Sequence, residues 1–160
     1  MKNFSISKIG INLIKNFESL SLEPYVCIGG YLTIGYGHKI QNPRIFYPKK
    51  ISLEQAHELL VYDVAIAERA VRNNIKIALL QNQFDALTSF TFNVGSGALQ
   101  RSTLRQKINQ ELFNEIEEEF LKWTYCKGKK IKGILIRRKI ESELFLNKLG
   151  RIKLESIKKI

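Results

Sequence analysis

The segment from Pro24 to Ile40 limits the possible folds most, because a helical pattern gives way there to short β-prone pieces broken by glycine. β-Branched and aromatic residues beside glycines are typical of strands joined by tight turns. The β-prone residues are Val26, Ile28, Tyr31, Thr33 and Ile34, and the glycines are Gly29, Gly30, Gly35 and Gly37. We therefore predict a small antiparallel sheet in this segment.

Helical patterns flank this sheet on both sides. Before it, apolar residues at helical spacing alternate with Lys, Asn and Ser, namely Ile6, Ile9, Leu13, Ile14 and Phe17. After a proline-containing loop at residues 41–50, Ser52 and Gln55 form a capping-box pattern that predicts a helix of about twenty residues. Further helices are expected at Gln81–Val94, which is apolar enough to be buried and should end at Gly95 and Gly97, around Ile116 to Trp123, and at Ile134–Leu149.

This order of elements predicts an α+β fold with segregated helices. We expect one domain at residues 1–150, with a basic tail at 151–160. Its small N-terminal lobe, about residues 15–60, would hold the short antiparallel sheet, and a long helix would connect it to an all-helical C-terminal lobe at about 75–150 that includes the N-terminal helix. A cleft between the lobes is the expected place for a ligand.

Composition narrows the function classes without choosing one. The chain has 160 residues, is 44% hydrophobic and carries a formal charge of +11, which favours nucleic acid, acidic membranes or cell-wall polymers as partners. Nothing near its start resembles a signal peptide, and no apolar run approaches the ~20 residues of a membrane span. We therefore expect a chain that is soluble where it is made.

Cysteine and histidine are too sparse for a metal centre or a disulfide scaffold. The two cysteines, Cys27 and Cys126, form no CxxC pair, and their spacing with His38 and His57 does not fit a zinc site. We expect no metal and no cofactor.

The chemistry-bearing residues are a glutamate, a cysteine and a threonine at fixed spacing. Glu18 ends the first helical pattern, where an apolar setting would keep it protonated as a general acid requires. Eight residues separate it from Cys27, and five more separate Cys27 from Thr33, which opens the run TIGYGH. The spacing resembles the catalytic signature of phage-type lysozymes, glycoside hydrolase family 24. QNQFDALTSFTFNVG, STL and GILIRRKIE extend the resemblance over roughly residues 8–148.

The resemblance implies a lysozyme-like fold and an endolysin that hydrolyses the β-1,4 bond between N-acetylmuramic acid and N-acetylglucosamine, causing host lysis. Glu18 would be the general acid, and Cys27 and Thr33 would position the water, giving inversion. It also implies sugar contacts for Phe92, Asn93 and Thr103, and a structural pair of His38 with Asp63. The implied partner is peptidoglycan rather than nucleic acid. The protein would act on it as a monomer, after release from the cytoplasm. Hydrolysis and transglycosylation both stay open.

Two other functions stay open. Cys27 stands where the family more often has aspartate, and a free thiol of pKa near 8.5 is mostly neutral at pH 7 unless a cation or helix end lowers its pKa. With Cys27 as nucleophile and His38 as base, the chain would be a cysteine peptidase or amidase acting on peptide stems. The +11 charge alone would suit a non-catalytic module that binds wall polymer or nucleic acid. The tail could also touch anionic membrane.

Overall fold

The computed structural model describes residues 5–27, 29–41, 49–126 and 128–148. Contacts among them divide the chain into two compact units. One unit holds the described residues from Glu18 to Ala65, and the other holds those up to Phe17 and from Ile66 onward. The order of helices and strands confirms the predicted α+β class with segregated helices, and we describe each unit by itself.

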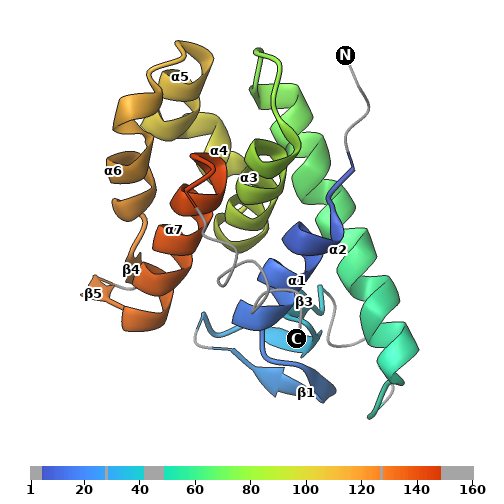
Figure 1. The fold of residues 1–160 in the computed structure, drawn as a ribbon. Helices are drawn as coiled ribbons and strands as arrows, with labels where there is room; N and C mark the ends of the chain where they lie inside the picture. The colour runs from blue at the N-terminus through green and yellow to red at the C-terminus, as the bar shows by residue number, and fades with distance from the viewer. Residues whose placement is uncertain (1–4, 28, 42–48, 127, 149–160) are drawn as a thin grey trace. The chain divides into compact units, whose positions relative to one another are not determined.

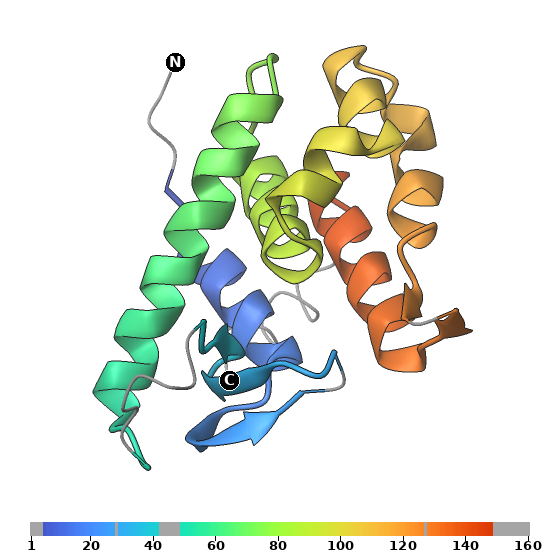
Figure 2. The same ribbon diagram turned by 180° about the vertical axis from the view of Figure 1, so that it is seen from behind.

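The first unit contains the predicted antiparallel sheet, drawn in blue in Figure 2. Its strands are β1 (Ser21–Val26), β2 (Leu32–Gly35) and β3 (His38–Lys39), in the order β1-β2-β3. β1 starts three residues before the predicted segment. The β2–β3 turn needs glycine, because Gly35 and Gly37 have φ values of 66° and 85°. The turns between successive strands bring the strands into contact, so that Thr33 pairs with residues of both β1 and β3.

Helix α2 (Leu53–Asn74) starts in this unit and confirms the expected long helix. The capping box is present: the Ser52 N–H donates to Gln55 Oε1 at 2.8 Å, and the Gln55 N–H donates to Ser52 Oγ at 3.1 Å. Ala56, in its first turn, packs with buried side chains of the sheet and its flanks, namely Ile34, Ile40 and Ile51. This small core supports β2 from one side.

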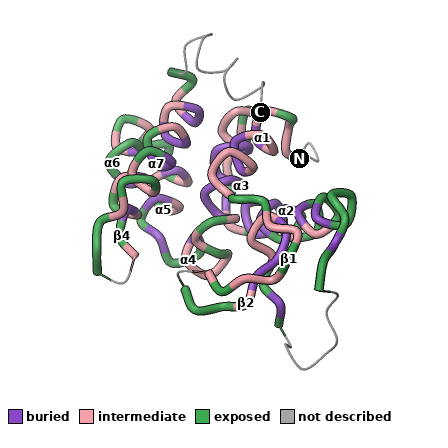
Figure 3. The backbone as a smooth tube through the Cα atoms, turned by 90° about the horizontal axis from the view of Figure 1, so that it is seen from below, coloured by how far each residue is buried: buried purple, intermediate pink, exposed green. Residues whose placement is uncertain are grey.

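The second unit is mainly helical and is organised around α3 (Gln81–Val94), which matches the predicted range (Figure 1). α3 packs against α1 (Lys8–Phe17) and α7 (Lys132–Phe145). All its residues from Phe84 to Thr91 are buried, as the purple stretch in Figure 3 shows. The other helical elements that lie wholly in this unit are α4 (Ser96–Arg101), α5 (Thr103–Asn109), a 3₁₀ turn (Phe113–Glu115) and α6 (Ile116–Leu121).

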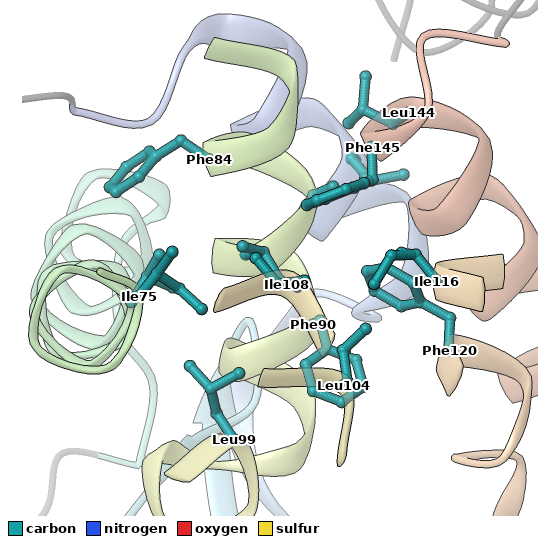
Figure 4. Packing of buried hydrophobic residues seen from close by; sticks show 14 residues of the cluster. Ile75, Phe84, Phe90, Leu99, Leu104, Ile108, Ile116, Phe120, Leu144 and Phe145 are labelled. Atoms are coloured by element: carbon teal, nitrogen blue, oxygen red, sulfur yellow. The ribbon is translucent and has the colours of Figure 1, made fainter. Parts of the chain in front are cut away.

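Aliphatic and aromatic side chains fill the core of this unit between α3, α5, α6 and α7 (Figure 4). The rings of Phe90 and Phe120 meet edge to face, with centroids 5.3 Å apart. Fully burying one such side chain contributes roughly 1.5–3 kcal/mol. The packing fixes α3, and with it the exposed residues near the C-terminal end of that helix.

Several predicted boundaries in this unit were wrong. Gly95 does end α3, its N–H donating to Thr91 O at 2.8 Å, but Gly97 lies inside α4. α7 starts two residues before the predicted Ile134 and ends at Phe145, before the predicted Leu149, which lies outside the described residues. A short hairpin of β4 (Tyr125–Cys126) and β5 (Lys129–Lys130) interrupts a lobe expected to be all helical.

Two other predictions fall largely outside the described residues, namely the loop at 41–50, of which 42–48 are not described, and the tail at 151–160. Among the described residues, no helix has the length and apolar character that crossing a membrane requires.

Candidate active site

Glu18 directly follows α1 and is half-buried. Its carboxyl group lies beside the β2–β3 turn, since a Cβ atom built on Gly37 would be 3.4 Å from Glu18 Oε2. Gly37 combines this close approach with a positive φ of 85°, so a side chain there would strain the backbone and contact the carboxyl group. The turn thus brings bare backbone next to Glu18.

Thr33 lies on the central strand β2 and is 2% exposed. Its Oγ1 is 3.0 Å from the carbonyl oxygen of Tyr25 and 3.3 Å from that of Tyr31, and its hydroxyl donates to them. The single hydroxyl proton serves one acceptor at a time, and the oxygen keeps lone pairs that can accept a hydrogen bond. Thr33 is therefore a fixed polar group within a largely apolar strand.

Cys27 follows β1 at the start of a tight turn. Its N–H donates to Tyr31 O at 3.0 Å, and its carbonyl accepts from the Gly30 N–H at 2.8 Å. The pKa of the Cys27 thiol lies below its ordinary value, chiefly through a backbone hydrogen bond from Tyr31. Burial opposes this shift, while the Gly29 backbone, the Thr33 side chain and the charge of Lys39 add to it. The turn and the cation therefore favour the thiolate.

His38 and Asp63 form the contact that the family resemblance implies. His38 Nδ1 lies 2.9 Å from Asp63 Oδ2, which joins β3 to α2. Asp63 could orient the imidazole as a catalytic base needs. However, the groups that shift the pKa of Cys27 come from its own turn, Thr33 and Lys39, and His38 is not among them.

Phe92, Asn93 and Thr103 belong to the helical unit. Phe92 is half-buried and Asn93 exposed near the C-terminal end of α3, whereas Thr103 is exposed at the start of α5. The Thr103 hydroxyl donates to Glu119 Oε2 at 2.5 Å, so its proton is engaged within the protein. Asn93 Oδ1 accepts a hydrogen bond from Arg138 Nη2 at 2.9 Å.

Glu119 is a buried carboxylate, 1% exposed, that was not predicted from the sequence. Burial alone would raise its pKa, but hydrogen bonds from Lys107, Lys122 and Thr103 outweigh burial and lower the pKa to about 2. Hydrogen bonds to Glu115 and Glu119 in turn raise the pKa of Lys107 to about 12. Lys107 and Glu119 lie on different helices, so sequence spacing does not reveal the pair.

Within the described ranges, no group of three or more His, Cys, Asp or Glu side chains is placed to hold a metal ion. A groove of about 400 Å³ lies in the helical unit between α2 and the α4 region. None of the predicted site residues lines it; its walls are Ile66, Arg69, Ala70, Asn73, Asn74, Ser96, Gly97 and Gln100.

Comparisons with known proteins agree on one family. The family model described as phage lysozyme matches residues 15–141. The endolysin of Bacillus phage B103 is 44% identical over 144 residues, 89% of this chain and 54% of that protein, so the chain spans about half the length of this relative. The endolysin of Salmonella phage P22 is 35% identical over 144 residues, 89% of this chain and 98% of that protein.

Solved structures give the same result. An endolysin from Escherichia coli O157:H7 phage FAHEc1 superposes with a TM-score of 0.80 at 36% identity, covering 92% of this chain and 96% of that one. The muramidase domain of SpmX from Asticaccaulis excentricus reaches 0.79 at 33% identity, covering 90% of this chain and 99% of that one. From the family match, the relatives and the shared fold, we conclude that the chain belongs to the phage lysozyme family.

Proposed function

We propose that this chain is an endolysin that hydrolyses the β-1,4 bond between N-acetylmuramic acid and N-acetylglucosamine in bacterial peptidoglycan. The observation that carries the proposal is the Cys27–Thr33 pair, built on the sheet of the unit that also holds Glu18. Membership of the phage lysozyme family supports the same reaction. The net charge of +11 suits an anionic wall as substrate.

In the proposed reaction, Glu18 donates its proton to the glycosidic oxygen as the bond from that oxygen to the anomeric carbon breaks. A water molecule attacks the anomeric carbon from the opposite face, which inverts its configuration. The oxygen of Thr33 accepts a hydrogen bond from this water. Cys27, whose pKa is lowered, takes the proton that the water loses. The pair would thus do the work of the aspartate more usual in the family.

We also propose a site of action for the protein, the bacterial cell wall. The chain would be made in the bacterial cytoplasm, released, and active as a monomer on the cell wall, without a metal or cofactor. Weak contact of the basic tail with anionic membrane would be an accessory to this action. Phe92 and Asn93 would contact the glycan, and His38 with Asp63 would support the sheet.

Replacing the acid tests the assignment. Glu18→Gln keeps the size of the side chain and removes its proton donor, so we expect lysis of isolated peptidoglycan to fall at least ~100-fold with folding intact. Glu23→Gln is the matched control, because Glu23 is an exposed glutamate of β1 in the same unit. Wild-type activity in Glu18→Gln, or an equal loss in both variants, would contradict the role of Glu18.

A further inference from the structure

Arg138 of α7 is the largest fully buried side chain in the chain's described part, with 0% exposure. Its Nε lies 3.0 Å from Glu141 Oε2, one turn further along the helix. Its guanidinium carbon also lies 4.8 Å from the centroid of the Phe90 ring, in cation–π contact. A buried ion pair and a packed aromatic face leave this guanidinium little freedom to move.

The third partner of Arg138 is Asn93, which is exposed. Arg138 Nη2 donates to Asn93 Oδ1 over 2.9 Å. A guanidinium carries only donors, so the amide must turn its oxygen, and not its nitrogen, toward Arg138. Because the amide is planar, the N–H that lies anti to the oxygen then points away from the guanidinium, whereas the other N–H runs nearly parallel to the C=O bond. The buried network thereby sets which polar group Asn93 offers at the surface.

We propose that Arg138 is a positioning residue that holds Asn93 with one Nδ2 donor facing the glycan, where it binds a hydrogen-bond acceptor. The acceptor that fits is the carbonyl oxygen of an N-acetyl group, which both sugars of the glycan carry in the proposed function. This inference rests on that function and adds a specificity-determining contact to it. A free amino group in place of the acetamide would be protonated and would carry only hydrogen-bond donors. It could therefore not accept a hydrogen bond from Asn93 Nδ2.

Asn93→Asp tests the contact with the fold preserved. A carboxylate has the size of the amide and accepts a charge-assisted hydrogen bond from Arg138, but it has no donor. We expect an unchanged or higher Tm and a KM for a soluble N-acetylated glycan tetrasaccharide about 10-fold higher, as the loss of one hydrogen bond implies, with kcat changed less than ~3-fold. A wild-type KM in Asn93→Asp would overturn the proposal.

Arg138→Lys and Arg138→Met test the positioning step. Lysine keeps a donor for Asn93 Oδ1 and should recover part of the binding that methionine loses. Asn82→Ala is the matched control, because Asn82 Nδ2 donates to Leu144 O at 2.8 Å and Phe145 O at 3.1 Å and so joins α3 to the α7 end without touching Asn93. If Asn82→Ala lowers the Tm as much as the Arg138 variants do, the KM should still rise only in the Arg138 variants. An equal rise in Asn82→Ala would show a merely structural role.

The NMR signals of the Asn93 side-chain amide give a readout that needs no activity. We expect them to move in Arg138→Lys, to stay in place in Asn82→Ala, and to shift when the tetrasaccharide is added to the wild type. If wild-type protein cleaves no peptidoglycan, the proposed function fails, whereas these signals still report whether Arg138 holds the amide. If the Asn93 signals do not move in Arg138→Lys, the positioning step is overturned, even if the enzyme is active.

Discussion

The Thr33 side chain lies near the thiol of Cys27 and helps to lower its pKa, which couples a residue of β2 to the residue that follows β1. Backbone N–H groups from the turn and the charge of Lys39 act on the same thiol and lower its pKa. These surroundings favour the thiolate form of a residue that stands where the family more often has aspartate.

Alkylation should report the lowered pKa of Cys27. We expect iodoacetamide to modify Cys27 with a pH midpoint below the usual ~8.5 of a free thiol. Lys39→Met should raise this midpoint, because it removes a positive charge that favours the thiolate. Site-resolved mass spectrometry in a Cys126→Ser background measures one thiol alone. A midpoint at or above the ordinary value would show that the turn does not favour the thiolate.

Substitution of Cys27 should separate its possible roles. We expect Cys27→Asp to stay active, because a carboxylate can take the proton of the water, and Cys27→Ala to lose most activity, because no acceptor remains. Lysis of isolated peptidoglycan is the measurement. Normal lysis by the alanine variant would make Cys27 a packing residue. Loss in both variants, with a thioester trapped on peptide substrate, would indicate a nucleophile.

His38→Asn should lower stability more than turnover. The change removes a partner that lies 2.9 Å from Asp63 and weakens the link between β3 and α2, while Cys27 and Thr33 keep their contacts. We expect a lower Tm and a kcat within ~3-fold of wild type, the scale of an indirect effect. Collapse of kcat at an unchanged Tm would instead make His38 catalytic.

Glu119 should make the stability of the folded protein depend on pH in the acidic range. Its folded pKa of about 2 lies below the ordinary 4.5, so its stabilising contribution is complete above pH 4.5 and is lost as the pH falls toward 2. The Tm difference between wild type and Glu119→Gln should therefore be largest above pH 4.5 and shrink toward pH 2. Glu118→Gln, an exposed neighbour on α6, should show no such dependence. A Tm difference constant from pH 6 to pH 2 would contradict the lowered pKa.

Local patterns predicted much of the fold, because hydrophobic spacing and capping act over a few residues. The Ser52–Gln55 capping box and the range of α3 are examples. The β4–β5 hairpin was missed because each strand has only two residues, too few to show an alternating apolar pattern. A segment of two short strands carries too little local signal to predict from sequence.

The candidate site, too, was predicted from the sequence only in part. The spacing of Glu18, Cys27 and Thr33 can be recognised in the sequence. The lowered pKa of Cys27 cannot, because it depends on a turn that brings backbone N–H groups to the sulfur. Arg138 and Glu141 are three residues apart on one helix, and such pairs usually lie at a helix surface. The burial of Arg138 and its contact with Asn93 depend on how α7 packs against α3.

The most direct test of the central claim is mass spectrometry of peptidoglycan digested in heavy-oxygen water. We predict fragments that end in reducing N-acetylmuramic acid and carry one heavy oxygen at the anomeric carbon, because water attacks that carbon. Anhydro ends without the label would mean transglycosylation instead of hydrolysis. Intact glycan strands with cleaved stem peptides would contradict the glycosidase account altogether and support the thiol nucleophile.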